Sequence, residues 1–175
     1  SLWAWAINNN KDVLSIGGRG ELSTSLGEWG LTYHLDSSKS ELHYRLALDY
    51  RYDGFIGFWN ESAIIQSDNV DINITVGADY TLPIGNGILV MSESMLIFSK
   101  YNRSSSQTGT AFMVRMPMGM FNNLMLISTL DWNENNNYNY LRFNSTFNSF
   151  SINCMVSINP NEVSNSSQLM FIYNH

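Results

Sequence analysis

Charge, cysteine and proline are scarce in this sequence. Only 14% of its 175 residues are charged, and it has one cysteine and three prolines. An ordinary soluble domain is roughly 25% charged, so a soluble protein of this composition would need neutral polar residues over nearly its whole surface. The lone Cys154 excludes an internal disulfide. Its apolar neighbours Ile152 and Val156 indicate a small apolar filler rather than a reactive thiol.

Other features are missing as well, and each excludes a class of protein. No run of about 18 apolar residues occurs, which excludes a helical membrane span. The net charge of −6 argues against nucleic acid as a partner. The histidines have no metal-ligand spacing, and neither His34 nor His43 has a serine two residues away. We therefore expect no metal, no cofactor and no enzyme.

What the sequence does contain is strict alternation, which is clearest in Glu41–Tyr52 (ELHYRLALDYRY). Leucine and tyrosine occupy the even-numbered positions there, while the odd-numbered positions hold acids, bases and one alanine. We call each such alternating set of positions a parity. Successive side chains of a strand point to opposite faces, so this stretch predicts a strand with one apolar and one ionised face. A soluble sheet turns its apolar face inward, whereas a transmembrane barrel turns it to lipid.

Comparable stretches recur along the chain with no helix, linker or domain boundary between them. They predict an all-β, antiparallel up-and-down β-barrel of about twelve strands, with residues 1–175 as a single domain. Besides Glu41–Tyr52 and the strand that follows Gly54, the ranges are Ser1–Ile7, Val13–Leu26, Trp29–Leu35, Asp71–Leu82, Ile88–Ser99, Thr110–Met118, Leu124–Asn133, Tyr138–Phe147, Phe150–Asn159 and Gln168–Asn174. Pro117 lacks a ladder donor, so we expect it near a strand end or a bulge.

The turn after Glu41–Tyr52 decides the register of the next strand. Tyr52-Asp53-Gly54 has glycine third, which suits a three-residue hairpin. That turn predicts Arg45 opposite Glu61, with Trp59 and Glu61 on the ionised face. A two-residue Asp-Gly turn would instead put Glu61 on the apolar face, so the first register is preferred.

Two regularities favour an apolar face that points outward. The connections alternate between a short set, such as Gly27 and Asn148-Ser149, and a longer set, such as Tyr101–Gly109 and Pro160–Ser167. Outer-membrane barrels have short periplasmic turns and longer extracellular loops. The aromatic residues also sort by depth into two rings, as at the two interfaces of a bilayer. The short-turn ring is Trp29, Tyr50, Tyr52, Phe58, Tyr80, Phe147, Phe150 and Tyr173, and the long-loop ring is Phe98, Tyr101, Phe112, Trp132 and Tyr138.

The alternation in Gly30–Leu35, Glu41–Tyr52 and Asp71–Leu82, with the terminal Gln168–His175 (QLMFIYNH), resembles that of Gram-negative outer-membrane porin-like β-barrels. Such barrels commonly end in an aromatic residue, whereas here Tyr173 is followed by Asn174 and His175. The resemblance implies an outer-membrane location, contact with outer-membrane lipid, and passive diffusion of small polar solutes. The start at Ser1, with no charged leader, leads us to expect a removed signal peptide or the C-terminal part of a longer porin. Oligomeric state stays open, a homo-oligomer included.

The ionised parity supplies the candidate pore-lining residues. They are Arg19, Glu21, Glu41, Arg45, Asp49, Arg51, Glu61, Asp79, Glu93, Arg115, Asp131 and Arg142. Acids outnumber bases on this parity, which predicts weak cation selectivity. Two alternatives stay open: a soluble or surface β-barrel that binds a small apolar ligand inside, and a barrel enzyme that uses lumen carboxylates.

Overall fold

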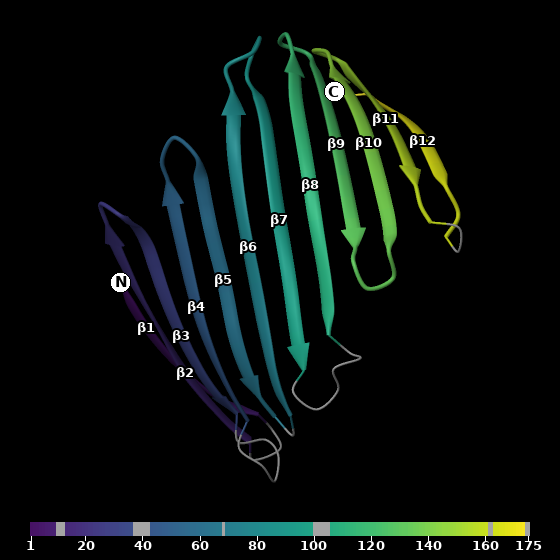
Figure 1. Cartoon of the computed structure of the whole chain (residues 1–175). Helices are drawn as coiled ribbons and strands as arrows, with labels where there is room; N and C mark the ends of the chain where they lie inside the picture. The colour runs from purple at the N-terminus through teal and green to yellow at the C-terminus, as the bar shows by residue number, and fades with distance from the viewer. Residues whose placement is uncertain (10–12, 37–42, 68, 100–105, 161–162, 174–175) are drawn as a thin grey trace. The chain divides into compact units, whose positions relative to one another are not determined.

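The structure is a computed structural model that describes residues 1–9, 13–36, 43–67, 69–99, 106–160 and 163–173. All of its regular elements are strands (Figure 1). Their bounds are β1 Leu2–Asn9, β2 Val13–Thr24, β3 Gly27–Asp36, β4 His43–Asp53, β5 Gly57–Gln66, β6 Val70–Leu82, β7 Ile88–Ser99, β8 Gln107–Met118, β9 Asn122–Asp131, β10 Asn136–Thr146, β11 Phe150–Ile158 and β12 Ser166–Tyr173. Within these ranges, no helix has the length and apolarity needed to cross a bilayer.

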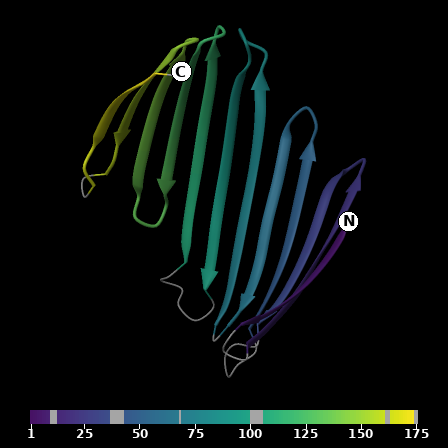
Figure 2. The same ribbon diagram turned by 180° about the vertical axis from the view of Figure 1, so that it is seen from behind.

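The twelve strands follow one another through a single sheet in chain order, β1 to β12. Figures 1 and 2 show the order from its two sides. The strands pair in antiparallel fashion, as between β2 and β3 or between β10 and β11. The prediction of an all-β, antiparallel up-and-down arrangement of about twelve strands is therefore confirmed. Pro117 is the second-last residue of β8, near a strand end as predicted.

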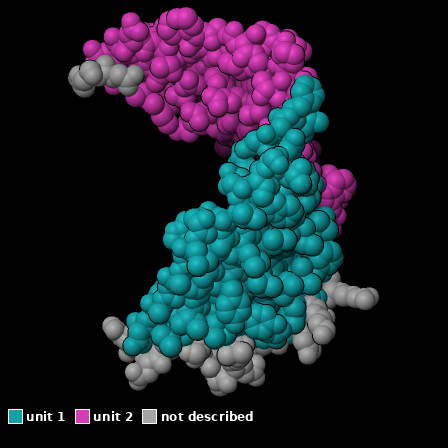
Figure 3. Space-filling model, turned by 90° about the vertical axis from the view of Figure 1, so that its left-hand side faces the viewer, with its two compact units in different colours: residues 1–77, 94–108 teal, residues 78–93, 109–175 magenta. Residues whose placement is uncertain are grey.

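The chain divides into two compact units, coloured separately in Figure 3. Unit 1 comprises residues 1–77 and 94–108 and contains β1 to β5. Unit 2 comprises residues 78–93 and 109–175 and contains most of β8 and all of β9 to β12. The boundary passes through β6 and β7. The expectation that residues 1–175 form one barrel domain stays a prediction.

In unit 1 the strand registers bring residues of like polarity together. Trp29 lies opposite Tyr50, Leu31 opposite Leu48, and Tyr33 opposite Leu46. These residues define the apolar face of unit 1. Residues directly opposite each other point to the same side of a sheet, so the alternate set, with Arg19, Asp49 and Glu61, defines the charged face of unit 1.

Unit 2 has the same two-sided construction. Its apolar face carries Val114 opposite Leu126, Leu126 opposite Leu141, and Leu141 opposite Val156. Its charged face carries Arg115, Asp131 and Arg142. For these residues of both units, the faces predicted from sequence are the ones that the backbone pairing produces.

The described residues contain no buried hydrophobic side chain. Leu31 and Leu48 are 53% and 43% exposed, and Leu126 and Leu141 are 39% and 42% exposed. The buried side chains are polar instead, namely Ser145, Ser151 and Asn153. A soluble domain draws most of its stability from the opposite arrangement, so the apolar faces need a partner outside the described chain. Cys154 lies on the apolar face of unit 2, opposite Leu169, and is exposed.

The hairpin between β4 and β5 differs from the predicted one. The turn is Gly54–Ile56, and Asp53 lies opposite Gly57. Arg45 therefore faces Ile65, and Glu61 faces Asp49, so the predicted pairing of Arg45 with Glu61 is wrong. The turn forms two residues later than predicted, which moves the pairing by an even number of residues. An even shift leaves every side chain on its predicted face.

Aromatic rings on the apolar side adjoin one another near the short turns in each unit. In unit 1 the ring of Tyr50 lies 4.3 Å from that of Trp29 and 6.0 Å from that of Phe58, centroid to centroid. In unit 2 the ring of Phe147 lies 5.9 Å from Phe121 and 4.6 Å from Phe150, and Phe150 lies 5.3 Å from Phe171. Five of the eight aromatics predicted for the short-turn ring thus have ring contacts within their own unit, namely Trp29, Tyr50, Phe58, Phe147 and Phe150.

At the long-loop ends of the strands, the structure agrees less closely with the predicted ring of aromatics. Tyr138 lies opposite Thr129 and so belongs to the charged face of unit 2, not to an apolar ring. Trp132 is 57% exposed, and its indole Nε1 donates to Thr110 Oγ1 at 3.0 Å. Tyr101 lies outside the described residues. The two sets of connections also overlap in length, since residues 67–69 separate β5 from β6 while residues 83–87 separate β6 from β7.

The observed register of β4 and β5 can be tested by cross-linking. In a Cys154→Ser background, Ala47→Cys with Ala63→Cys should form a disulfide on mild oxidation, because these residues are direct partners and direct partners have Cα atoms about 4.5–5.5 Å apart. Ala47→Cys with Trp59→Cys is the matched control, since those two would be partners in the three-residue turn predicted from sequence. A preferential cross-link in the control pair on non-reducing gels would overturn the register.

Candidate functional site

The charged face of unit 1 carries six of the predicted pore-lining residues. Arg19 and Glu21 come from β2, Glu61 comes from β5, and Arg45, Asp49 and Arg51 come from β4. The registers place all six on one side of the sheet. Glu28, Asp36 and Asp53 occupy the same side, so carboxylates outnumber guanidinium groups on β2 to β5.

The remaining predicted residues are more scattered. Arg115, Asp131 and Arg142 share the charged face of unit 2. Asp79 follows Gly77 by two residues in β6 and so points to the same side of that strand, and Glu93 lies within β7. Glu41 lies outside the described residues.

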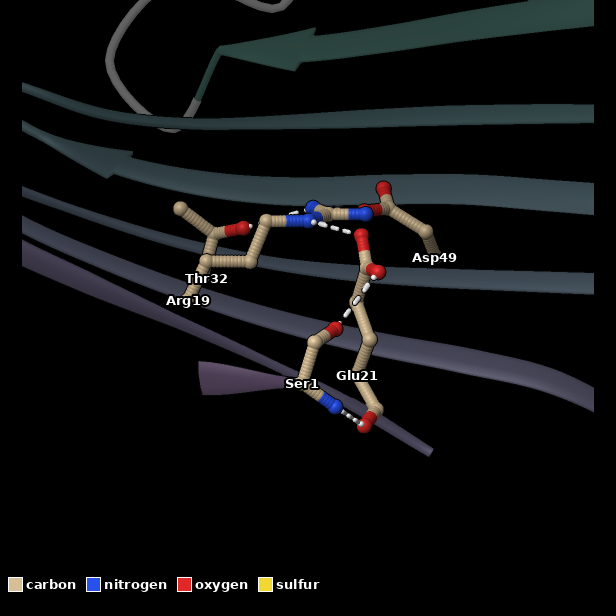
Figure 4. A network of polar contacts seen from close by, with 5 residues as sticks. All are labelled: Ser1, Arg19, Glu21, Thr32 and Asp49. Atoms are coloured by element: carbon tan, nitrogen blue, oxygen red, sulfur yellow. Dashed lines mark hydrogen bonds and ion pairs between the residues drawn. The ribbon is translucent and has the colours of Figure 1, made fainter. Parts of the chain in front are cut away.

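A polar network lies on the charged face of unit 1 (Figure 4). The Arg19 guanidinium donates from Nε to Glu21 Oε1 at 2.9 Å and from Nη1 to Thr32 Oγ1 at 2.7 Å. Nη1 also bonds the Asp49 carboxylate. Ser1 Oγ donates to the other oxygen of Glu21 at 3.1 Å. One cation thus bridges two carboxylates that come from β2 and β4, across the intervening strand β3.

Gly30 is the residue of β3 over which Arg19 crosses. It lies directly opposite both Glu21 and Asp49. A Cβ atom at this position would be 2.6 Å from Arg19 Nη2 and 3.0 Å from Asp49 Oδ2. Any side chain there would displace the guanidinium, so the bridge depends on a glycine.

Two further glycines on the same face lie under tryptophan rings. A Cβ on Gly17 would be 2.4 Å from the Trp5 ring, and one on Gly77 would be 2.1 Å from the Trp59 ring. The indole Nε1 of Trp5 donates to Nδ1 of His34 at 3.2 Å. Sequence analysis placed Trp59 on this face but missed these pairs. The sequence did show a glycine on the ionised parity of each neighbouring strand. Parity alone could not tell which tryptophan lies over which glycine.

Asp49 and Glu61 face each other beside an open hollow of about 360 Å³. Its lining includes Arg45, Asn73 and Thr75. Like charges directly opposite each other in a sheet are destabilising. The Arg19 bond to Asp49 reduces that repulsion from one side. In the described chain, no group of three or more His, Cys, Asp or Glu side chains is arranged to hold a metal ion.

In unit 2 the corresponding contacts are mostly neutral. Arg142 Nη2 donates to Asn153 Oδ1 at 2.9 Å, and Asn144 Nδ2 donates to the same oxygen at 2.7 Å. Asn153 is only 4% exposed, so this oxygen is satisfied by two donors. Arg142 thus pairs with an amide oxygen and not with a carboxylate.

Comparisons with known proteins place few constraints on this chain. No protein-family model matches it, and no curated protein matches it. A solved structure described as "KdgM porin in complex with disordered oligogalacturonate" is similar to this chain, with a TM-score of 0.45 and 7% sequence identity, over 91% of this chain and 90% of that one.

The tryptophan–glycine contact between β5 and β6 gives a test of the charged face. Gly77→Ala should lower the free energy of unfolding by about 1–3 kcal/mol, because its Cβ would overlap the Trp59 ring and overpacking typically costs this much. Urea unfolding of the detergent-folded protein measures the change. Gly20→Ala is the matched control, since its Cβ would lie 3.8 Å from Leu2 Cδ1 in ordinary contact.

The same Gly77→Ala change made together with Trp59→Ala completes this test. With the ring gone, the alanine should have little further effect beyond that of Trp59→Ala alone. An undiminished penalty would show that the ring is not what Gly77 accommodates.

Proposed function

We propose that residues 1–175 form a single β-barrel domain in the outer membrane of a Gram-negative bacterium. The domain acts as a porin-like channel for passive diffusion of small polar solutes or ions, with weak cation selectivity. The observation that carries the proposal is the distribution of apolar side chains. They line one face of each unit, and none is buried in the described chain.

Lipid is the partner that fits such a face. Burying a Leu, Ile or Phe side chain away from water is worth about 1.5–3 kcal/mol, so leaving two apolar faces in water would be costly. A membrane also requires that backbone groups be satisfied within the protein. Pairing between successive strands from β1 to β12 does this within the sheet, and closure of the proposed barrel would do it at the outer edges of β1 and β12. Aromatic rings near the short turns suit the interface between hydrocarbon and headgroups.

The charged faces support the channel rather than an enzyme. Arg19, Asp49 and their neighbours are half-exposed, as side chains in contact with water would be. Their hydrogen bonds join strand to strand and leave an open hollow instead of an enclosed pocket. In a lumen this arrangement would line a water-filled path, and the excess of carboxylates on β2 to β5 would favour cations.

The lipid-facing assignment predicts a difference between the two parities of a strand. Leu46→Arg and Leu126→Arg should each destabilise the folded protein by roughly 2–4 kcal/mol in bilayers, the cost of a cation near the bilayer midplane. Thr129→Arg should be mild, because Thr129 lies on the charged face of unit 2. Unfolding titrations in lipid vesicles supply the free energies. Equal losses for Leu126→Arg and Thr129→Arg would mean that the apolar face does not contact lipid.

The channel assignment predicts a salt-dependent reversal potential. Under a KCl gradient in a planar bilayer, the protein should prefer K⁺ weakly at low salt. The preference should fade as salt approaches about 1 M, where the Debye length is about 3 Å. Asp79→Asn combined with Glu93→Gln should reduce it. Absence of conductance, or a preference for Cl⁻, would overturn the proposal, and a protein that stays monodisperse without detergent would point to a soluble barrel.

A further inference from the structure

The Arg19 bridge is unusual in joining strands that are not neighbours. Glu21 and Asp49 belong to β2 and β4, which lie on either side of β3. Neighbouring strands are about 4.8 Å apart, so the backbones of β2 and β4 are separated by roughly two such spacings. Arg19 spans this distance by lying across the backbone of β3, where Gly30 presents no side chain.

The Arg19 bridge determines which carboxylate of one row on the charged face has no bond to a guanidinium group. Glu21, Gly30, Asp49 and Glu61 form one row of direct partners across four strands. Arg19 contacts the first and third members of the row. Glu61, the fourth, is exposed beside the hollow, and within the described chain its carboxylate forms no hydrogen bond or ion pair.

We infer that Gly30 is a positioning residue for ion selectivity: it seats Arg19 between Glu21 and Asp49, which leaves Glu61 as the carboxylate of this row that acts on permeating cations. The inference rests on the proposed channel function and adds the residue that sets its charge balance. Gly30 itself is uncharged and contacts no ion.

The consequence is that an uncharged substitution should alter selectivity. In Gly30→Ala the new Cβ would displace Arg19, whose guanidinium is the flexible end of a long side chain, so the strand can still form. Asp49 would then lie opposite Glu61 without the bond from Arg19 that offsets its negative charge. The negative potential over the hollow should rise, and with it the preference for cations.

Reversal potentials of four variants, each compared with the wild-type protein, test this directly. In a dilute KCl gradient, Gly30→Ala should raise the K⁺ over Cl⁻ permeability ratio by roughly twofold, an effect of the size expected for a half-exposed ion pair. Arg19→Gln should raise it further, and Glu61→Gln should lower it. Gly20→Ala, on the apolar face beside the same row, should leave the ratio unchanged.

A combined variant distinguishes the positioning of Arg19 by Gly30 from a general disturbance of the strands. Adding Gly30→Ala to Arg19→Gln should change nothing more, because the displaced group is already absent. If Gly30→Ala conducts with the wild-type ratio, or shifts the ratio equally with and without Arg19, the inference is wrong. If the wild-type protein does not conduct, the proposed function fails instead.

A second measurement does not require conductance. Arg19→Gln and Asp49→Asn, alone and together, form a double-mutant cycle in urea unfolding of the detergent-folded protein. The two substitutions should be coupled when Gly30 is present and additive in the Gly30→Ala background. Coupling of equal size in both backgrounds would overturn the seating role of Gly30, whatever the channel does.

Discussion

Each unit of this sheet has an apolar face with no protein against it, and the rest of the structure depends on that constraint. A β-strand sends alternate side chains to opposite sides, so a chain that alternates leucine with arginine or aspartate must present both kinds of surface. Here no described apolar side chain is buried. In the proposed outer-membrane barrel, the strand ladder would satisfy the backbone groups and lipid would cover the apolar faces.

The charged faces are organised by glycine as much as by charge. Gly30, Gly17 and Gly77 each lie beneath a large side chain of a neighbouring strand, respectively Arg19, Trp5 and Trp59. A glycine weakens a strand when considered alone, yet each of these lets a long side chain lie flat across the sheet. Half-exposed ion pairs contribute little stability individually, so the Arg19 bridge matters more for where charge is placed than for holding the strands together.

The two units use their charged faces differently. On β2 to β5 of unit 1, carboxylates exceed guanidinium groups, and a single arginine is shared between two acids. On β8 to β11 of unit 2, Arg142 is held by the buried Asn153, and neutral amides provide most of the contacts. Any preference of the proposed channel for cations would thus draw on the carboxylates of β2 to β5 in unit 1, together with Asp79 and Glu93 of unit 2.

The sequence by itself determined the strand number, the antiparallel order and the face of nearly every side chain, because a period of two in polarity records the pleat directly. It could not determine the turn at Gly54–Ile56, since an even shift of register leaves every residue on the same face. For the same reason the pairing of Glu61 with Asp49, and the seating of Arg19 over Gly30, were decided only by the tertiary structure. Parity tells which side a residue points to, but only the register and the reach of each side chain decide what it meets there.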